Sequence, residues 1–278
     1  MTDLTLEVYT SPFRDLSTGG QFSPTTSTLV YGPTEAVLVD AQYMLSDIAE
    51  IGALIETSGR TLTTVYVTHA HADHYFGLEW LLDRFPAARA VALPAVVDDI
   101  AATNEDARAQ WRDWFSGQAL DNTVIPEAMD GETLTVDGHE LRTILLGQGD
   151  IDNSTALHIP DLDAVVAGDV AYNGIHSMLA LTGPAEWRQW IASIDKIAAL
   201  NASTVIAGHK RPELADTSAA TLDRTRDYIE AFIDEVENSA NSRDMVARMQ
   251  TRFPEFGNPT ALVLSAVTAF KRKKHAHQ

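Results

Sequence analysis

The sequence contains no cysteine among its 278 residues. Disulfides, thiolate metal ligands and a thiol nucleophile are therefore excluded, which leaves histidine, aspartate and glutamate as the strong metal ligands. Basic residues are also few, because 20 Lys and Arg stand against 39 Asp and Glu and give a formal net charge of −19. A field of that sign repels polyanions. We therefore expect a small-molecule substrate as the partner, and neither nucleic acid nor an anionic membrane surface.

Long apolar runs are absent as well, and no run approaches the roughly 20 residues of a membrane span. The first residues, MTDLTLEVYTSPF, lack the basic and apolar regions of a signal peptide. We therefore expect a cytoplasmic protein. With 45% hydrophobic residues, the chain can bury a sizeable core.

Short β-branched runs alternate with helical patterns along the chain. Two runs split by Gly32-Pro33 predict a β-hairpin, and the run 63–70 predicts a buried strand. Helical periodicity follows in several places, and the basic end KRKKHAHQ is expected to fray. The helical segments are one that ends at Gly59, and then 78–85, 98–115, 184–200 and about 217 onward. Two blocks that are each sheet-rich and then helical predict two packed sheets with helices outside.

Three histidines and an aspartate crowd the stretch THAHADH, which contains His69, His71, Asp73 and His74. The two histidines spaced two apart can point the same way, with the carboxylate and the last imidazole beside them. Such a donor set suits two adjacent divalent metals. The alternative is a solvated, histidine-rich turn. The spacing disfavours this alternative, because an HxHxDH pattern arises by chance in only about one chain of this composition in two thousand.

With these residues the sequence resembles the metallo-β-lactamase fold superfamily, whose members share an αββα sandwich and an HxHxDH motif. The resemblance extends from about Thr26 to His209 and covers three further places. Asp40 in VLVDA matches an acidic residue beside the site, Asp169 in VVAGDVAY matches the bridging aspartate, and His209 in VIAGH matches the last histidine. The resemblance implies that Asp73, His74 and His209 hold one metal, His69 and His71 hold the other, and Asp169 bridges them.

The family pattern breaks at Gln148, in LLGQGDIDN, where the superfamily has another histidine. A neutral amide oxygen is a much weaker donor for zinc than imidazole. This substitution leaves three alternatives for the first site. Gln148 binds the metal nevertheless, which favours manganese or iron; Asp150 or Asp152 binds in its place; or only the site of Asp73, His74 and His209 is filled. A fourth alternative is a protein that has lost its metal.

Other side chains are weaker candidates. Tyr172 and His176 follow the bridging aspartate, so we expect them to contact substrate or a developing oxyanion, with a packing role as the alternative. Trp111, Trp114 and Phe115 form an apolar stripe, which is typical of core or of a subunit interface and less often of a substrate wall.

Together these patterns predict an α/β (α+β) protein, with a four-layer αββα metallo-β-lactamase-like sandwich over residues 1–212. Residues 213–278 are predicted to be a C-terminal helical extension packed on the same domain, as a pocket wall or a homodimer surface.

The predicted function is metal-dependent hydrolysis of a small ester, lactone, thioester or amide, with β-lactamase-like chemistry included. One or two zinc ions, or manganese or iron, would activate a water as hydroxide. Asp73 would ligate and accept the proton of that water. The alternatives are an iron-dependent oxidoreductase on the same fold and a non-catalytic binding protein.

Overall fold

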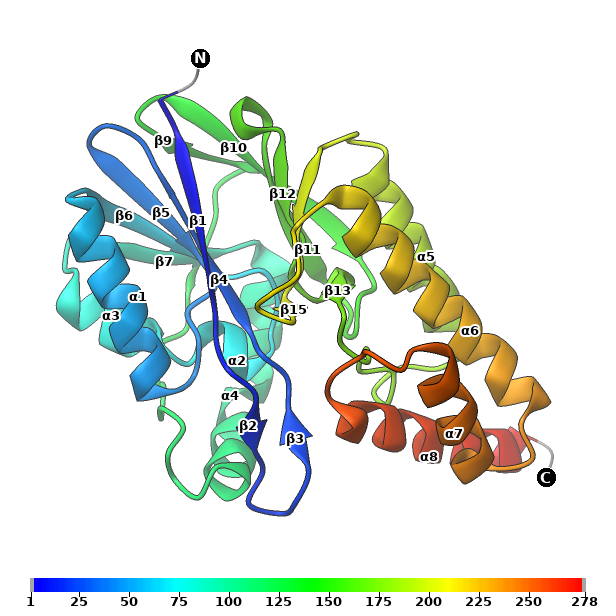
Figure 1. Ribbon diagram of the computed structural model, residues 1–278. Coiled ribbons are helices and arrows are strands. Elements are labelled where there is room, and N and C mark those ends of the chain that lie inside the picture. Colours follow the sequence, from blue (N-terminus) through cyan, green and yellow to red (C-terminus); the bar gives the residue numbers. More distant parts are fainter. Residues whose placement is uncertain (1–2, 277–278) are drawn as a thin grey trace.

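Two β-sheets face each other between two groups of helices in the computed structural model, which describes residues 3–276 (Figure 1). Helices α1 and α3 lie on one outer side, and α5 and α6 lie on the other. This arrangement is the predicted four-layer sandwich. No helix within residues 3–276 combines the length and the apolar character needed to cross a membrane.

The first sheet has six strands in the order β1-β4-β5-β6-β7-β8. Strands β4 and β5 are antiparallel, which confirms the hairpin predicted around Gly32-Pro33, whereas β5, β6, β7 and β8 run parallel. The parallel strands bring their carboxyl ends to one edge, where side chains that follow the strands gather. The strands are β1 (Thr5–Thr10), β4 (Thr26–Tyr31), β5 (Glu35–Val39), β6 (Thr61–Tyr66), β7 (Arg89–Ala92) and β8 (Glu127–Ala128).

The second sheet has five strands in the order β14-β12-β11-β10-β9, and two short two-stranded sheets accompany it. Strands β12 and β14 are parallel, so their carboxyl ends also meet at one edge. The five strands are β9 (Thr133–Val136), β10 (His139–Gly147), β11 (Ser154–Ile159), β12 (Ala164–Val166) and β14 (Thr204–Ile206). The short sheets pair β2 (Arg14–Asp15) with β3 (Gln21–Phe22), and β13 (Tyr172–Asn173) with β15 (His209–Lys210).

The helices fill the connections and cover the outer faces of the sheets. The first group is α1 (Leu45–Ser58), α2 (Ala72–Tyr75), α3 (Leu78–Arg84) and α4 (Pro94–Trp114). The second group is α5 (Pro184–Ala198), α6 (Arg224–Asn238), α7 (Ser242–Arg252) and α8 (Pro259–Ala276). Short turns are 3-10 helical at η1 (Pro160–Leu162) and η2 (Gly168–Val170), and π-helical at η3 (Ala219–Asp223).

Alternating side chains explain why each sheet is covered on both faces. On β5, Val37 and Val39 pack in the core between the sheets, whereas Ala36 and Leu38 pack in the core beneath the first group of helices. Successive residues of a strand point to opposite faces, so a continuous apolar run such as AVLV needs a partner on each side. The run therefore requires a buried central strand.

Helices α6, α7 and α8 share a hydrophobic core with the second sheet. Tyr228, Phe232 and Met245 from these helices lie in the same buried cluster as Val165 on β12 and Trp190 on α5. Helix α8 continues to Ala276, so the expectation that the basic tail frays from Lys271 is wrong for residues 271–276. The last two residues of that tail lie outside the described residues. Four basic side chains near a helix C-terminus interact favourably with its partial negative charge.

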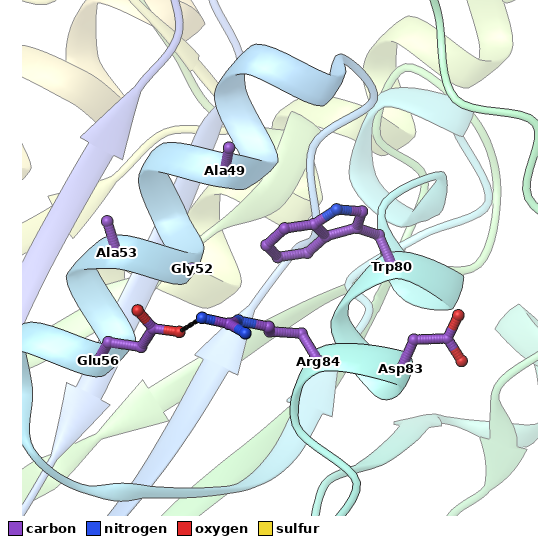
Figure 2. Close-up of a pocket in the computed structure, with 7 residues that line it drawn as sticks. All are labelled: Ala49, Gly52, Ala53, Glu56, Trp80, Asp83 and Arg84. Atoms are coloured by element: carbon purple, nitrogen blue, oxygen red, sulfur yellow. Dashed lines mark hydrogen bonds and ion pairs between the residues drawn. The ribbon is translucent and has the colours of Figure 1, made fainter.

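A shallow groove between α1 and α3 shows how closely the outer helices pack (Figure 2). The ring of Trp80 lies over Gly52, where an added Cβ would meet the ring at 2.7 Å. Glu56 and Arg84 form an exposed ion pair across the groove. No histidine lines this groove within the described residues, so it is unrelated to the histidine cluster.

Candidate metal centre

Six of the sequence-predicted metal residues converge at the edge where the strands of both sheets end. His69 and His71 lie in the turn after β6, and Asp73 and His74 lie on α2. From the second sheet, η2 after β12 places Asp169, and His209 begins β15 directly after β14. Five of the six are buried, and His71 is partly exposed.

The first group of potential metal ligands contains two imidazoles and two carboxylates. His69, His71, Asp150 and Asp169 each place one ligand atom within 4.8 Å of the others. His71 Nδ1 lies 3.0 Å from Asp150 Oδ2, and His69 Nε2 lies 3.6 Å from Asp169 Oδ2. The sequence alone left Asp150, Asp152 and Gln148 as competing candidates, and the fold brings the Asp150 carboxylate into this group.

The second group contains Asp73, His74 and His209. The Nε2 atoms of both histidines lie 3.4 Å from Asp73 Oδ2. Thr25 donates a hydrogen bond of 2.8 Å from its hydroxyl to the same carboxylate oxygen and thereby orients it. Imidazole nitrogens and a carboxylate that converge in this way form a set typical of zinc and other divalent ions.

Asp169 lies between the two groups. Its Oδ1 is 3.2 Å from His74 Nε2, and its Oδ2 is 3.0 Å from His209 Nε2 as well as near His69 of the first group. One fully buried carboxylate therefore contacts imidazoles from both groups. This is the position that a ligand bridging two metal ions requires.

Outer hydrogen bonds aim the imidazoles at the site. Nδ1 of His74 bonds Asp40 Oδ2 at 2.8 Å, and Nδ1 of His209 bonds the carbonyl of Pro24 at 2.9 Å. Nδ1 of His69 bonds the hydroxyl of Thr68 at 2.9 Å. Metal-binding histidines typically use the second nitrogen in this way, which fixes the ring and leaves Nε2 for the ion. Asp40 was predicted beside the site, whereas Thr68 and the Pro24 carbonyl carry no sequence signal.

Several atoms of the site have no hydrogen-bond partner although they are buried. They are Nε2 of His69 and His74 and Oδ1 of Asp150 and Asp169. Leaving a buried polar atom unpaired is costly, so such atoms call for an explanation. Converging lone pairs of imidazole and carboxylate are what a metal ion satisfies, and the residues therefore fit one.

The electrostatics of the site also favour a cation. Burial alone would lower the pKa of His71, but the carboxylates of Asp150, Asp169 and Asp73 together outweigh burial and raise that pKa to about 10. Burial alone would raise the pKa of Asp169, but His209, His74 and His69 outweigh it and hold that pKa well below the usual range. Positive charge is thus stabilised among these carboxylates, whether protons or metal ions carry it.

Gln148 has a different environment from the one expected of a ligand. Its amide nitrogen donates to the carbonyl of Gly149 at 3.1 Å. It lines an open pocket together with Asp150, Leu181 and Arg272. Asp152, the other candidate, is exposed, and its carboxylate accepts a hydrogen bond from the Asn153 amide.

Tyr172 and His176 are both buried and line the cavity above the clusters. The Tyr172 hydroxyl lies 3.1 Å from Asp169 Oδ2 and 3.2 Å from Asp150 Oδ2, so its one proton can bond either carboxylate. The His176 side chain instead hydrogen-bonds Tyr228 through Nδ1 at 3.1 Å. Tyr172 therefore contacts the predicted ligands directly, and His176 belongs to the wall.

The family model of the metallo-beta-lactamase superfamily matches residues 20–209. The chain belongs to this superfamily. This result confirms both the resemblance inferred from the HxHxDH motif and the αββα sandwich fold of the superfamily. A search of curated protein sequences finds no significant match.

Solved structures of metallo-beta-lactamase superfamily proteins share this fold. A family protein from Thermus thermophilus is 18% identical, with 99% of this chain and 94% of that chain covered and a TM-score of 0.66. The metallo-beta-lactamase from Pontibacter korlensis is 17% identical, with coverages of 81% and 94% and a TM-score of 0.62. FIM-1 from Pseudomonas aeruginosa, solved in its mono-zinc form, is 16% identical, with coverages of 82% and 92% and a TM-score of 0.59. At these identities, the likeness demonstrates the fold.

Proposed function

We propose that this protein is a metallo-hydrolase that holds two divalent metal ions and cleaves a small carbonyl substrate, such as an ester, lactone, thioester or amide. The observation that carries the proposal is the position of Asp169. This buried carboxylate contacts histidines from both ligand groups, and it lies at the base of a cavity that His71, Asp73 and His209 also line.

In this proposal Asp150 takes the place of the expected histidine in the first site. It is 1% exposed, lies 3.0 Å from His71 and leaves Oδ1 without a hydrogen bond. Its carboxylate brings a negative charge that the amide of Gln148 lacks. The first site then has two nitrogen and two oxygen ligands, and the second has Asp73, His74 and His209 with Asp169 shared.

We propose zinc as the metal, with manganese and iron as the alternatives. When bound, such ions lower the pKa of water toward 7 and stabilise developing negative charge on a carbonyl oxygen. The residues of the chain orient that chemistry. Asp73, held by Thr25, is placed to accept a proton, and the Tyr172 hydroxyl can donate to an oxygen that becomes negative above Asp169.

Counting metals in matched variants tests this proposal. Protein purified without chelating resin is analysed by inductively coupled plasma mass spectrometry, and turnover of simple aryl esters and lactones is followed. We expect about two metals per chain in the parent, about one in Asp150→Ala, and two in Asp152→Ala and Gln148→Ala. Ester and lactone turnover should be lost in His74→Ala. A parent without metal or metal-dependent turnover would contradict the proposal and favour a binding protein.

A second candidate, an iron-dependent oxidoreductase, is favoured by one feature of the first site. Two histidines with a carboxylate, which the first group contains, are a ligand set typical of non-haem iron oxygenases. Iron content together with oxygen consumption that stops in Asp150→Ala would support this candidate. Zinc content with ester cleavage in the absence of oxygen would exclude it.

A further inference from the structure

The cavity above the two ligand groups is small and apolar on its upper walls. Its volume is about 270 Å³, just below the usual range for ligand pockets of about 300–1,000 Å³. The lower part consists of the predicted metal ligands and Tyr172. The apolar side chains of the upper walls are Phe22, Trp111, Trp114, Met178, Leu181 and Leu264.

One wall is a cluster of aromatic rings fixed against the site. Phe22 packs edge-on against Trp111 at 5.2 Å between ring centroids and against the ring of His209 at 6.0 Å. Trp111 in turn contacts Trp114 at 5.9 Å. Because these rings contact both one another and a predicted metal ligand, the wall is continuous from Trp114 to His209. The stripe at Trp111 therefore serves as both core and cavity wall.

The opposite wall comes from the segment before α5 and from the last helix. Met178, Ala180 and Leu181 line it, with Ala261, Leu264 and Thr268 of α8. Helices α4 and α8 lie at the same end of the molecule, which Figure 1 shows below the two sheets. Residues more than 150 positions apart thus form one pocket, and the C-terminal helix supplies part of its wall.

The charge of the cavity is the decisive feature. None of the described residues that line it is lysine or arginine. Its carboxylates are Asp73, Asp150 and Asp169, all of which belong to the ligand groups. His71 and His209 also line it and belong to the ligand groups. Outside these groups no described residue of the lining has a charged side chain, and His176 is neutral at pH 7 because burial lowers its pKa to about 4.

A neighbouring cationic side chain lies outside this cavity. Arg272, also on α8, lines the adjacent open pocket with Glu186 and Asp152, and its guanidinium donates to the carbonyl of Thr182. It is therefore already paired and next to other carboxylates. The proposed metal ions lie with the ligand groups in the lower part of the cavity, where their charge is offset by Asp73, Asp150 and Asp169. Among the described residues, a substrate tail between the apolar upper walls therefore meets no cationic side chain that could compensate a negative charge of its own.

We propose that the substrates are uncharged carbonyl compounds with a short apolar acyl chain, which packs between the aromatic wall and α8. This inference deepens the proposed function and rests on it. It excludes substrates that carry a carboxylate or phosphate on the acyl side, because burial of an unpaired anion in this cavity is unfavourable. An added CH₂ should instead strengthen binding about three- to fourfold until the cavity is filled.

Paired esters that differ only at the end of the chain test the proposal. We compare 4-nitrophenyl hexanoate with the mono-4-nitrophenyl ester of adipic acid, and the acetate, butyrate and hexanoate esters with one another. In the parent we expect kcat/KM to be at least about tenfold higher for hexanoate than for the adipate ester, and to rise from acetate to hexanoate. Equal or better cleavage of the adipate ester would overturn the proposal. If that cleavage were then lost in Arg272→Gln, Arg272 would be the cation that binds the carboxylate.

Two neighbouring residues of α8 provide matched variants. Leu264 lines the cavity and Val263 does not, although both are similarly exposed at 46% and 44%. Leu264→Arg should narrow the preference for the uncharged ester about fivefold or more, whereas Val263→Arg should leave it unchanged. If both variants changed the preference for hexanoate over the adipate ester equally, net charge would decide that preference, and the cavity would not be the binding site of the acyl chain.

A binding experiment separates this inference from the proposed hydrolysis. Two of the five tryptophans, Trp111 and Trp114, line the cavity, so ligand binding should change tryptophan emission. Hexanamide should bind at least about tenfold more tightly than adipic acid monoamide, which has the same head group. Binding of hexanamide without turnover of any ester would contradict the proposed hydrolase but support the ligand class. Ester turnover with no preference between the two amides would support the hydrolase and contradict the ligand class.

Discussion

Asp40 and His74 form a buried pair in which the carboxylate accepts a hydrogen bond of 2.8 Å from Nδ1 of the imidazole. Asp40 also accepts from the amide and hydroxyl of Thr68, and Thr68 in turn contacts the ring of His69. One carboxylate at the end of β5 therefore orients one histidine of each ligand group. This relationship links the first sheet to both groups of predicted metal ligands.

Asp40→Asn should therefore weaken metal binding. An asparagine amide has only one acceptor oxygen, so it cannot accept from both His74 and the Thr68 backbone as the two carboxylate oxygens do. We expect metal affinity to fall about 10- to 100-fold, which chelator competition measures. Asp195→Asn, at an exposed ion pair with Arg226, is the control and should not change the affinity. Unchanged affinity in Asp40→Asn would contradict this orienting role.

Gly208→Ala should displace Asp169 from its position between the sites. A Cβ at residue 208 would lie 1.9 Å from Asp169 Oδ1 and 2.7 Å from the backbone carbon of Gly168, so the carboxylate has to move. We expect loss of at least one metal per chain and a decrease of about 1–3 kcal/mol in the free energy of unfolding. In Gly183→Ala, the nearest atom is the flexible end of Glu186 at 3.1 Å, so metal content should stay at the parent value.

Removal of metal should lower the thermal stability. A ligand that binds only the folded state at about 1,000 times its Kd contributes about 4 kcal/mol, and for a chain of this size that corresponds to about 10 °C in Tm. We expect chelator-treated protein to unfold about 10 °C lower and to recover when zinc is added. His74→Ala, which keeps only the first ligand group intact, should recover less of its Tm than the parent when zinc is added. An identical Tm with and without chelator would argue against bound metal.

The free energy of unfolding of the metal-free protein should fall below neutral pH because His176 is buried in its neutral form. Burial lowers its pKa from 6.5 to about 4, so between these values the unfolded chain binds a proton and the folded chain does not. The contribution of His176 is complete above pH 6.5 and is lost as the pH falls toward 4. Between pH 7 and pH 5, the parent should lose about 2 kcal/mol more of its free energy of unfolding than His176→Gln, measured by urea titration. Equal losses would mean that His176 is protonated in the folded protein.

Two packed sheets with helices outside could be predicted from the sequence, because strand alternation and helical periodicity are local properties of the chain. The run AVLV on β5 requires burial on two faces, and THAHADH after a buried strand requires an edge where ligands gather. Asp169 and His209 were also predictable, since each directly follows a short apolar strand and matches the family pattern.

In contrast, the residue that joins His69 and His71 and the walls of the cavity could be identified only from the folded chain. Gln148, Asp150 and Asp152 lie within five residues in one loop, and only the packing of that loop against Tyr172 and His71 brings the Asp150 carboxylate inward. The pocket combines Trp111 of α4 with Leu264 of α8. Contacts across such a distance depend on how the layers pack, and no local periodicity encodes them.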